Sequence, residues 1–269
     1  MGVLIDTHCH LDVPEFDPDR DQVLTEAHSR GVGAIVVPAI HAAGWPGLLA
    51  LCRRAPDLYP ALGLHPVYLD RHQASDLVVL EGLIARESPV AVGEIGLDFI
   101  LRDLDRERQR DLFVRQLRLA AAADLPVLIH ARKSHDQVLA ALRRNPVPGG
   151  IIHAFNGSLQ QAHRYLDLGF KLGFGGMLTF DRSSHLRALA VALPLNALVL
   201  ETDAPDMTVA AHRGERNSPA YLPDVLAALA VLRGLDAEYL AEQTSRNACQ
   251  VLGLDPGRGM SPLSGNESR

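Results

Sequence analysis

Cysteine is scarce in this chain of 269 residues. Cys9, Cys52 and Cys249 are widely spaced and odd in number, and they form no C-x-x-C pair. This pattern argues against a disulfide framework and fits a reducing compartment, so we interpret all three as buried, unreactive thiols. The N-terminus lacks the basic segment of a secretory signal, and the sequence lacks any run of about 18 apolar residues. We therefore expect a cytoplasmic protein that does not enter a membrane.

Positive charge is also scarce, because the formal net charge is −6. A protein that coats duplex nucleic acid usually presents a basic face, so any contact with nucleic acid is expected to be local. No G-x-G-x-x-G motif follows the first apolar run. This absence disfavours a dinucleotide-binding sheet.

Short apolar runs are abundant, and the hydrophobic content is 47%. Most of these runs are continuously apolar, which is typical of parallel strands buried on both faces. Eight such runs are rich in β-formers and bounded by turn residues: 3–6, 32–39, 59–66, 90–98, 125–132, 150–157, 170–176 and 197–205.

Segments with helical periodicity lie between the runs, including 20–31, 106–124, 134–145 and 158–169. The longest is predicted to carry Leu112, Leu119 and Ala120 near one face, and the last two begin at Ser134 and Ser158, which can serve as N-caps. Strands spaced by roughly 25 to 35 residues suit βα units. Eight units predict a closed (β/α)₈ TIM barrel of about 250 residues. An open doubly wound sheet is the alternative.

The sequence shows no internal linker. We therefore predict one α/β domain over residues 1–255, followed by a Gly/Pro/Ser-rich, flexible tail over 256–269.

Polar residues with metal-binding side chains lie near or just past the ends of six of the runs: His8, His10, His65, Glu94, His130, His153, Glu201 and Asp203. In a barrel these strand ends converge on one face. In an extended chain Asp6, His8 and His10 point to the same side, although Asp6 alone can instead bind a backbone amide. Burying unpaired polar groups costs about 2–7 kcal/mol each. We therefore predict that a pair of divalent ions satisfies this cluster.

The segments that carry these residues form a known pattern. They are IDTHCHLD, ALGLHP, AVGEIGLD, LPVLIHAR, IHAFNGS, VLETDAP and RNSPAYLP. In this order, over residues 3 to 252, the sequence resembles the TatD family of metal-dependent deoxyribonucleases. The segments ETDAPDM and SLQQAHRYLDLG resemble its YjjV-type subgroup most.

The resemblance implies a TIM barrel with a two-metal hydrolytic centre. It implies six metal ligands: His8, His10, Glu94, His130, His153 and Asp203. The first two would bind one ion together with Asp203, and His130 and His153 would bind the second. Glu94 would bridge the two ions as a catalytic ligand.

The resemblance also assigns residues around the ions. Asp203 would take the proton from the attacking water, and His65 would act beside it by contacting a phosphate. Glu201 would orient the ligands without binding an ion. Arg132 and Arg216 would bind phosphate.

The activity that the resemblance implies is a 3′ to 5′ exonuclease on single-stranded or frayed DNA. Mixed imidazole and carboxylate ligands suit Zn²⁺ or Mn²⁺, whereas Mg²⁺ prefers oxygen ligands but is abundant. The identity of the ions therefore stays open. DNA strand ends are the expected partner, and we expect the chain to act as a monomer.

Three alternatives remain open. The same barrel supports amide or lactone hydrolases, although many of those bridge their metals with a modified lysine where this chain offers Glu94. An ester hydrolase acting on aminoacyl-tRNA is the second, and a metal-binding repair factor without enzymatic activity is the third. The sequence differs from the usual family pattern at Ala154 and Asn156, where Cys and Ser or Thr are common, and this bears on substrate preference.

Overall fold

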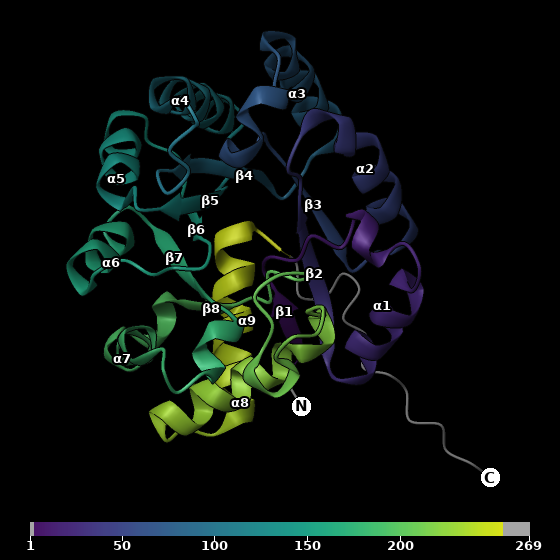
Figure 1. The fold of residues 1–269 in the computed structure, drawn as a ribbon, viewed down its shortest axis with the longest axis vertical. Coiled ribbons are helices and arrows are strands. Elements are labelled where there is room, and N and C mark those ends of the chain that lie inside the picture. Colours follow the sequence, from purple (N-terminus) through teal and green to yellow (C-terminus); the bar gives the residue numbers. More distant parts are fainter. Residues whose placement is uncertain (1–2, 255–269) are drawn as a thin grey trace.

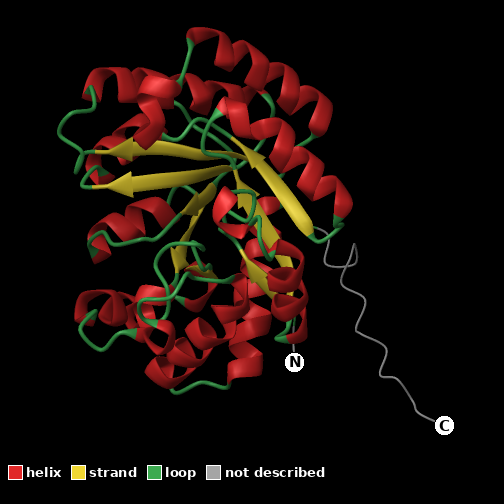
Figure 2. Cartoon of the chain, turned by 45° about the vertical axis from the view of Figure 1, so that its right-hand side comes forward, coloured by secondary structure: helices red, strands yellow, loops and turns green. Residues whose placement is uncertain are grey.

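The computed structural model describes residues 3–254, so the predicted tail over 256–269 lies outside the described residues. Eight parallel strands pair in chain order, and a shell of helices surrounds them (Figures 1 and 2). The strands are β1 (Leu4–Asp6), β2 (Val32–Pro38), β3 (Leu58–Leu62), β4 (Ala91–Asp98), β5 (Val127–Arg132), β6 (Gly150–Ile152), β7 (Phe170–Phe174) and β8 (Leu198–Leu200). Each predicted run contains or overlaps a strand, so the predicted TIM barrel is confirmed. Several strands end before the predicted run does, and the remaining residues form the loops at the C-terminal face.

The helices are α1 (Arg20–Ser29), α2 (Trp45–Arg54), α3 (Ala74–Glu87), α4 (Arg106–Ala122), α5 (His135–Arg144), α6 (Leu159–Leu166), α7 (Ser184–Ala192), α8 (Leu222–Arg233) and α9 (Ala237–Leu252). All four segments that were predicted as helices are helical. The hydroxyl of Ser158 accepts a hydrogen bond from the Gln161 N–H and caps α6, as predicted. The prediction for Ser134 is wrong, because its hydroxyl donates to the carbonyl of Leu97 instead of capping α5.

The interior of the barrel is filled by small and branched apolar side chains from the strands, such as Ala61, Val36 and Ile151. Ala248 and Leu252 of α9 pack against this cluster, and Figure 1 shows α9 lying across the middle of the ring of strands. Apolar packing therefore closes one end of the barrel. The polar residues occupy the other end.

The buried face of α4 differs from the predicted one. Its five buried residues are Gln109, Phe113, Gln116, Leu117 and Ala120. Ala120 was predicted on this face, but Leu112 and Leu119 are only half-buried at its edges. Hydrophobic periodicity misplaced the face because two of its members are glutamines.

The seam between β8 and β1 is closed by contacts of Asp6 and Thr7. The Thr7 N–H and hydroxyl both donate to the carbonyl of Leu200 at 3.0 Å. The Asp6 carboxylate accepts from the N–H of Thr202 at 3.0 Å and from its hydroxyl at 2.5 Å. Asp6 therefore joins the first and last strands. This is the alternative considered from the sequence, in which Asp6 binds a backbone amide.

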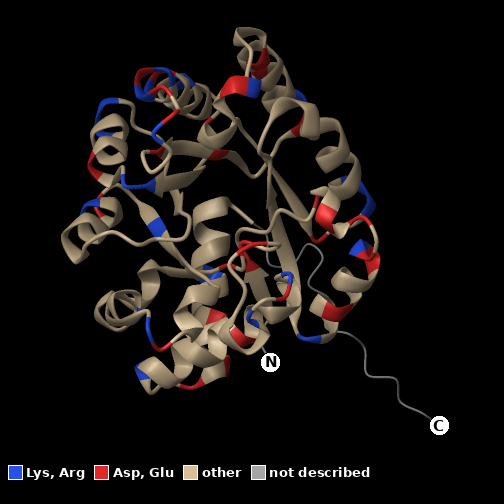
Figure 3. Ribbon diagram, viewed as in Figure 1, with Lys and Arg blue, Asp and Glu red and all other residues tan. Residues whose placement is uncertain are grey.

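Acidic and basic side chains are interspersed over the outer helices, and Figure 3 shows no face of a single sign in this view. Within residues 3–254, no helix has both the length and the apolar character that crossing a membrane requires. Cys9 and Cys52 are buried as expected, whereas Cys249 is half-buried.

Candidate metal centre

The C-terminal end of the barrel gathers the predicted ligands. His8 and His10 follow β1, His65 follows β3 and His153 follows β6 directly. Four others complete the set: Glu94 on β4, His130 on β5, and Glu201 and Asp203 just after β8. Residues separated by nearly the whole chain thereby become neighbours, as the strand-end pattern predicted.

The first group of donors comprises His8, His10 and Glu94. The two imidazole Nε2 atoms lie 3.3 Å apart, and Glu94 Oε2 lies 3.1 Å from that of His8 and 3.5 Å from that of His10. Asp203 Oδ1 lies 3.7 Å from His10 Nε2 and 4.0 Å from His8 Nε2. These are the four residues expected around the first ion and its bridge.

The second group of donors comprises His65, Glu94 and His130. The other carboxylate oxygen of Glu94, Oε1, lies 3.3 Å from His65 Nε2 and 3.1 Å from His130 Nδ1. Glu94 thus offers one oxygen to each group, which is the arrangement that a bridging ligand needs. His65, which was expected to contact phosphate, lies within this group.

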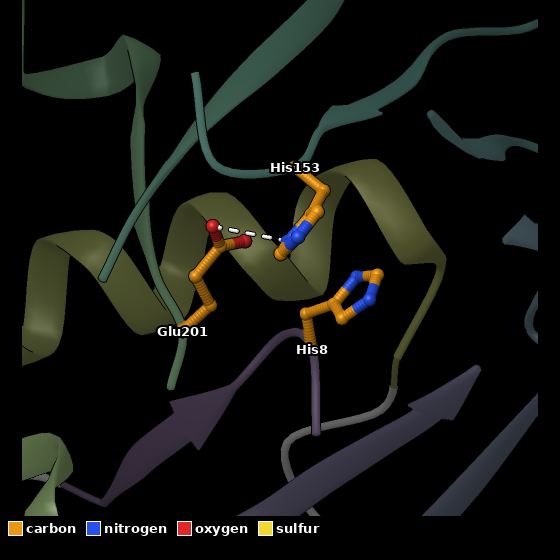
Figure 4. A group of neighbouring side chains, drawn as sticks. All are labelled: His8, His153 and Glu201. Atoms are coloured by element: carbon orange, nitrogen blue, oxygen red, sulfur yellow. Dashed lines mark ion pairs between the residues drawn. The ribbon is translucent and has the colours of Figure 1, made fainter. Parts of the chain in front are cut away.

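The predicted partner of His130, His153, lies against a different set of residues. Figure 4 shows its ring between Glu201 and His8. Its Nδ1 is 3.2 Å from Glu201 Oε1 and its Nε2 is 3.4 Å from Asp203 Oδ2, and its ring stacks on that of His8 with centroids 3.7 Å apart. The pairing of His130 and His153 around one ion therefore stays a prediction.

The orienting role of Glu201 stays a prediction, because its carboxylate also lies with His8 and His153 in a group of atoms close enough to hold an ion. Glu201 is fully buried, and its Oε1 also accepts from the Ala154 N–H at 2.6 Å. Residue 173 of the neighbouring strand β7 is glycine, where a Cβ would lie 2.1 Å from Glu201 Oε2. The absence of a side chain at Gly173 therefore makes room for this carboxylate.

His130 is held by a residue that sequence reasoning did not single out. Its Nε2 lies 3.0 Å from Oδ2 of Asp98, a buried carboxylate at the end of β4. Gly96 pairs with His130 in the ladder between β4 and β5, and a Cβ there would meet the carbonyl of His130 at 2.0 Å. Asp98 ends the quoted segment AVGEIGLD, so its position after a buried strand was the available signal.

The pKa values of Glu94 and Asp203 are both lowered by neighbouring imidazoles. Burial alone would raise the pKa of Glu94, but the imidazoles of His65 and His8 hold it well below its usual value. Burial opposes ionisation of Asp203 as well, yet His153 brings its pKa to about 2. Both residues therefore present negative charge to any cation at neutral pH.

The pKa values of the imidazoles are shifted in different directions by their surroundings. Burial lowers the pKa of His65 to about 4, and it also lowers the pKa of His8. Burial acts in the same direction on His153, but Glu201 and Asp203 raise its pKa well above the usual value.

The donor set fits divalent ions. Neutral imidazole nitrogens and ionised carboxylate oxygens are the ligands of Zn²⁺ and Mn²⁺ in proteins. Among the described residues, three buried atoms of the centre lack a hydrogen-bond partner: His8 Nδ1, His153 Nδ1 and Glu201 Oε2. A cation bound by each group would satisfy the nitrogens and carboxylate oxygens that lie together there.

A cleft of about 940 Å³ opens from this centre. Its wall includes Arg132, Tyr68, Arg182 and Met207 beside the donor groups. The side chain of Arg132 is 48% exposed, and its Nη1 lies 3.4 Å from Asp98 Oδ2 at the wall of the cleft. This position suits the predicted contact with phosphate.

Arg216 is engaged elsewhere. Its guanidinium donates to both carboxylate oxygens of Asp19, at 2.8 and 2.6 Å, and lies over the ring of Phe16. Binding of phosphate by Arg216 stays a prediction that requires these bonds to rearrange. The next residue, Asn217, is buried and donates to the carbonyls of Thr202 and Asp206, so it braces the loop that carries Asp203.

Comparisons with known proteins agree with this geometry. Residues 5–253 match the family model described as TatD related DNase. The chain is 44% identical over 246 residues to the uncharacterized metal-dependent hydrolase YjjV of Escherichia coli K12, covering 90% of this chain and 95% of the relative. The 3′-5′ ssDNA/RNA exonuclease TatD of Escherichia fergusonii is 32% identical, with 93% and 99% covered.

The crystal structure of the Escherichia coli K12 YjjV protein superposes with a TM-score of 0.90 at 42% identity, covering 94% of this chain and 98% of that one. Fold, sequence and donor set agree over nearly the whole described chain. The chain belongs to the TatD family of metal-dependent hydrolases.

Proposed function

We propose that this protein is a deoxyribonuclease that removes nucleotides from the 3′ ends of single-stranded or frayed DNA with the help of two divalent ions. The observation that carries the proposal is the position of Glu94, whose two carboxylate oxygens each lie within 3.5 Å of two imidazole nitrogens of a separate donor group. Two ions that share a ligand form the centre used for in-line displacement at phosphorus. The name of the Escherichia fergusonii relative supports DNA or RNA as substrate.

In the proposed reaction water adds to phosphorus, the bond between phosphorus and the 3′ oxygen breaks, and the shortened strand keeps a 3′ hydroxyl. Divalent ions bound by the two donor groups would acidify the water and neutralise charge on the phosphoryl oxygens. Asp203 is ionised and partly exposed to the cleft, so it is positioned to take the proton from the water. Arg132 would hold a phosphate oxygen at the wall of the cleft.

Two features support strand ends as the substrate, in preference to a duplex that the protein wraps. The net charge is −6, and acidic and basic residues are interspersed over the outer helices (Figure 3). A protein that grips many phosphates needs a basic surface, whereas one that holds a strand end needs only local cations. All of the donors come from one chain, which supports action as a monomer.

The test uses single-stranded DNA labelled at the 3′ or the 5′ end, incubated with protein loaded with Mn²⁺ or Zn²⁺. Shortening from the 3′ end is expected for the unmodified protein. Glu94→Gln should lower the rate at least about 100-fold, because residues that only orient ligands already contribute 10–100-fold. Glu87→Gln is the matched control, since Glu87 ends α3 outside the centre and pairs with Arg53 of α2 and Arg86 of α3.

Equal digestion by the unmodified protein and by Glu94→Gln would reveal a contaminating nuclease and reject the proposal. Panels of amides, lactones and aminoacyl esters belong in the same experiment. The centre would be assigned to one of these substrate classes instead if the unmodified protein hydrolysed that class and left DNA intact, and if Glu94→Gln abolished the hydrolysis.

A further inference from the structure

Two buried glutamines of α4 make matching contacts with the backbone of two strand ends. Gln109 and Gln116 are seven residues apart, so they lie on the same face of the helix two turns from each other. Both are fully buried although a helix face packed on a sheet is usually apolar. Their amides therefore have a specific task in the core.

Gln116 pairs with the residue before His65. Its Oε1 accepts from the Leu64 N–H at 2.8 Å and its Nε2 donates to the Leu64 carbonyl at 3.1 Å. Strand β3 has ended at Leu62, so the glutamine amide acts where a strand partner would otherwise bind. The two peptide groups that flank the Cα of Leu64, directly before His65, are thereby both fixed.

Gln109 makes the same pair of bonds with Asp98. Its Oε1 accepts from the Asp98 N–H at 2.9 Å and its Nε2 donates to the Asp98 carbonyl at 3.0 Å. The side chain of Asp98 in turn reaches His130 Nε2 at 3.0 Å. The chain of contacts therefore runs from α4 through Asp98 to a histidine of the second donor group.

The need for these amides follows from the sheet. The ladder between β3 and β4 pairs only Ala61 with Ala91 and Leu62 with Val92. The ladder pairs no residue after Leu62 with β4, so the buried backbone groups of Leu64 require other partners. Side-chain amides satisfy a backbone N–H and a carbonyl at once, which an apolar side chain cannot do.

We propose that Gln109 and Gln116 are positioning residues that set the spacing of His65 and His130 around Glu94 Oε1, and thereby the affinity of the second donor group for its ion. The proposal rests on the proposed function in taking this group as a metal site. Gln116 binds the backbone of Leu64, the residue before the donor His65. Gln109 binds the backbone of Asp98, whose carboxylate contacts the donor His130. A helix outside the barrel thus controls the geometry of the metal centre inside it.

The test is titration with Co²⁺, followed by calorimetry and by visible absorption, which reports coordination geometry. Gln116→Met and Gln109→Met keep the side-chain size but lose both hydrogen bonds. Each is expected to weaken the second ion 10–100-fold and to alter its absorption, as loss of a residue that orients ligands does. Titration in a His10→Ala background, which disables the first group, isolates the second.

Leu117→Ala is the control for a purely structural effect. Leu117 is buried on the same helix in the main core, so this variant loses stability without touching the strand-end peptides. Equal loss of second-ion affinity in Leu117→Ala and Gln116→Met would overturn the proposal, and so would unchanged affinity in both methionine variants.

If Gln116→Met does not fold, Gln116→Asn replaces it in the test, because asparagine keeps the amide group on a side chain that is one methylene shorter. Intermediate affinity supports the proposal, and affinity equal to that of the unmodified protein rejects it. In metal-free protein, amide exchange should accelerate at Leu64 in Gln116→Met and at Asp98 in Gln109→Met. If the unmodified protein binds two ions but leaves DNA intact, the proposed nuclease activity is rejected, whereas the proposed role of the glutamines is not.

Discussion

Asp6 accepts two hydrogen bonds from Thr202, one from its N–H and one from its hydroxyl, across the seam of the barrel. The same carboxylate accepts from the His8 N–H at 3.2 Å. Asp6 lies two residues before His8, and Thr202 precedes Asp203. One carboxylate therefore closes the barrel and fixes the two backbone segments that carry ligands of the first group.

Asp6→Ala is predicted to lower the free energy of unfolding by about 3 kcal/mol or more, because it leaves three buried donors without an acceptor and each costs about 1–3 kcal/mol. Thr202→Val removes one of the donors and should cost about 1–3 kcal/mol, since it leaves a buried carboxylate oxygen unpaired. Urea unfolding measures both. Thr25→Val, at an exposed threonine of α1, should change the value by less than about 0.5 kcal/mol. A cost for Asp6→Ala as small as that of the control would contradict this account of the seam.

The barrel could be predicted because parallel strands buried on both faces leave continuous apolar runs in the sequence. The ligands could be predicted for a related reason: imidazoles and carboxylates such as His130 and Glu94 stand out against these runs. Asp98 did not stand out, because an aspartate at the end of a strand resembles an ordinary turn residue. Its contact with His130 exists only once β4 and β5 are in register.

The contacts of each histidine were harder to predict than its place in the metal centre. His153 follows β6 and His8 follows β1, and these strands are not adjacent in the sheet. Their rings nevertheless stack, because side chains from opposite sides of a small barrel meet in its interior. Gln109 and Gln116 were missed because a polar residue in a helical pattern indicates an exposed face.

Removal of the ions is predicted to destabilise the fold. A ligand that binds only the folded state at 100 times its Kd stabilises that state by about 2.7 kcal/mol. For a chain of this size, about 1 kcal/mol corresponds to 2–4 °C, so chelation should lower Tm by roughly 5–10 °C for each site. Calorimetry with Mn²⁺ and with a chelator measures the difference. In Glu94→Gln the difference should shrink strongly, and an undiminished shift would mean that the stabilising ions bind outside the two donor groups.

Arg132→Ala is predicted to raise KM for single-stranded DNA about tenfold with a smaller effect on kcat. The guanidinium is half-exposed at the wall of the cleft, so its loss removes one phosphate contact. The slope of log KM against log salt concentration should fall by about the contribution of one phosphate contact. Arg246→Ala, at an exposed arginine of α9, is the control and should leave both quantities unchanged. A KM and salt slope that Arg132→Ala leaves as they were would remove Arg132 from the binding site.

Cys52 is predicted to resist alkylation in the folded protein at pH 8. Burial raises the pKa of its thiol from 9.0 to about 12, and the nearby carboxylates of Asp12 and Asp57 act in the same direction. A raised pKa lowers the fraction of thiolate, which at pH 8 is then roughly 10⁻⁴. Because the thiolate is the reactive form, iodoacetamide should modify the half-buried Cys249 well before Cys52, and peptide mapping by mass spectrometry distinguishes the two. In urea both should react at similar rates. Rapid native labelling of Cys52 would show that α2 opens locally, since the side chain is only 9% exposed in the folded structure.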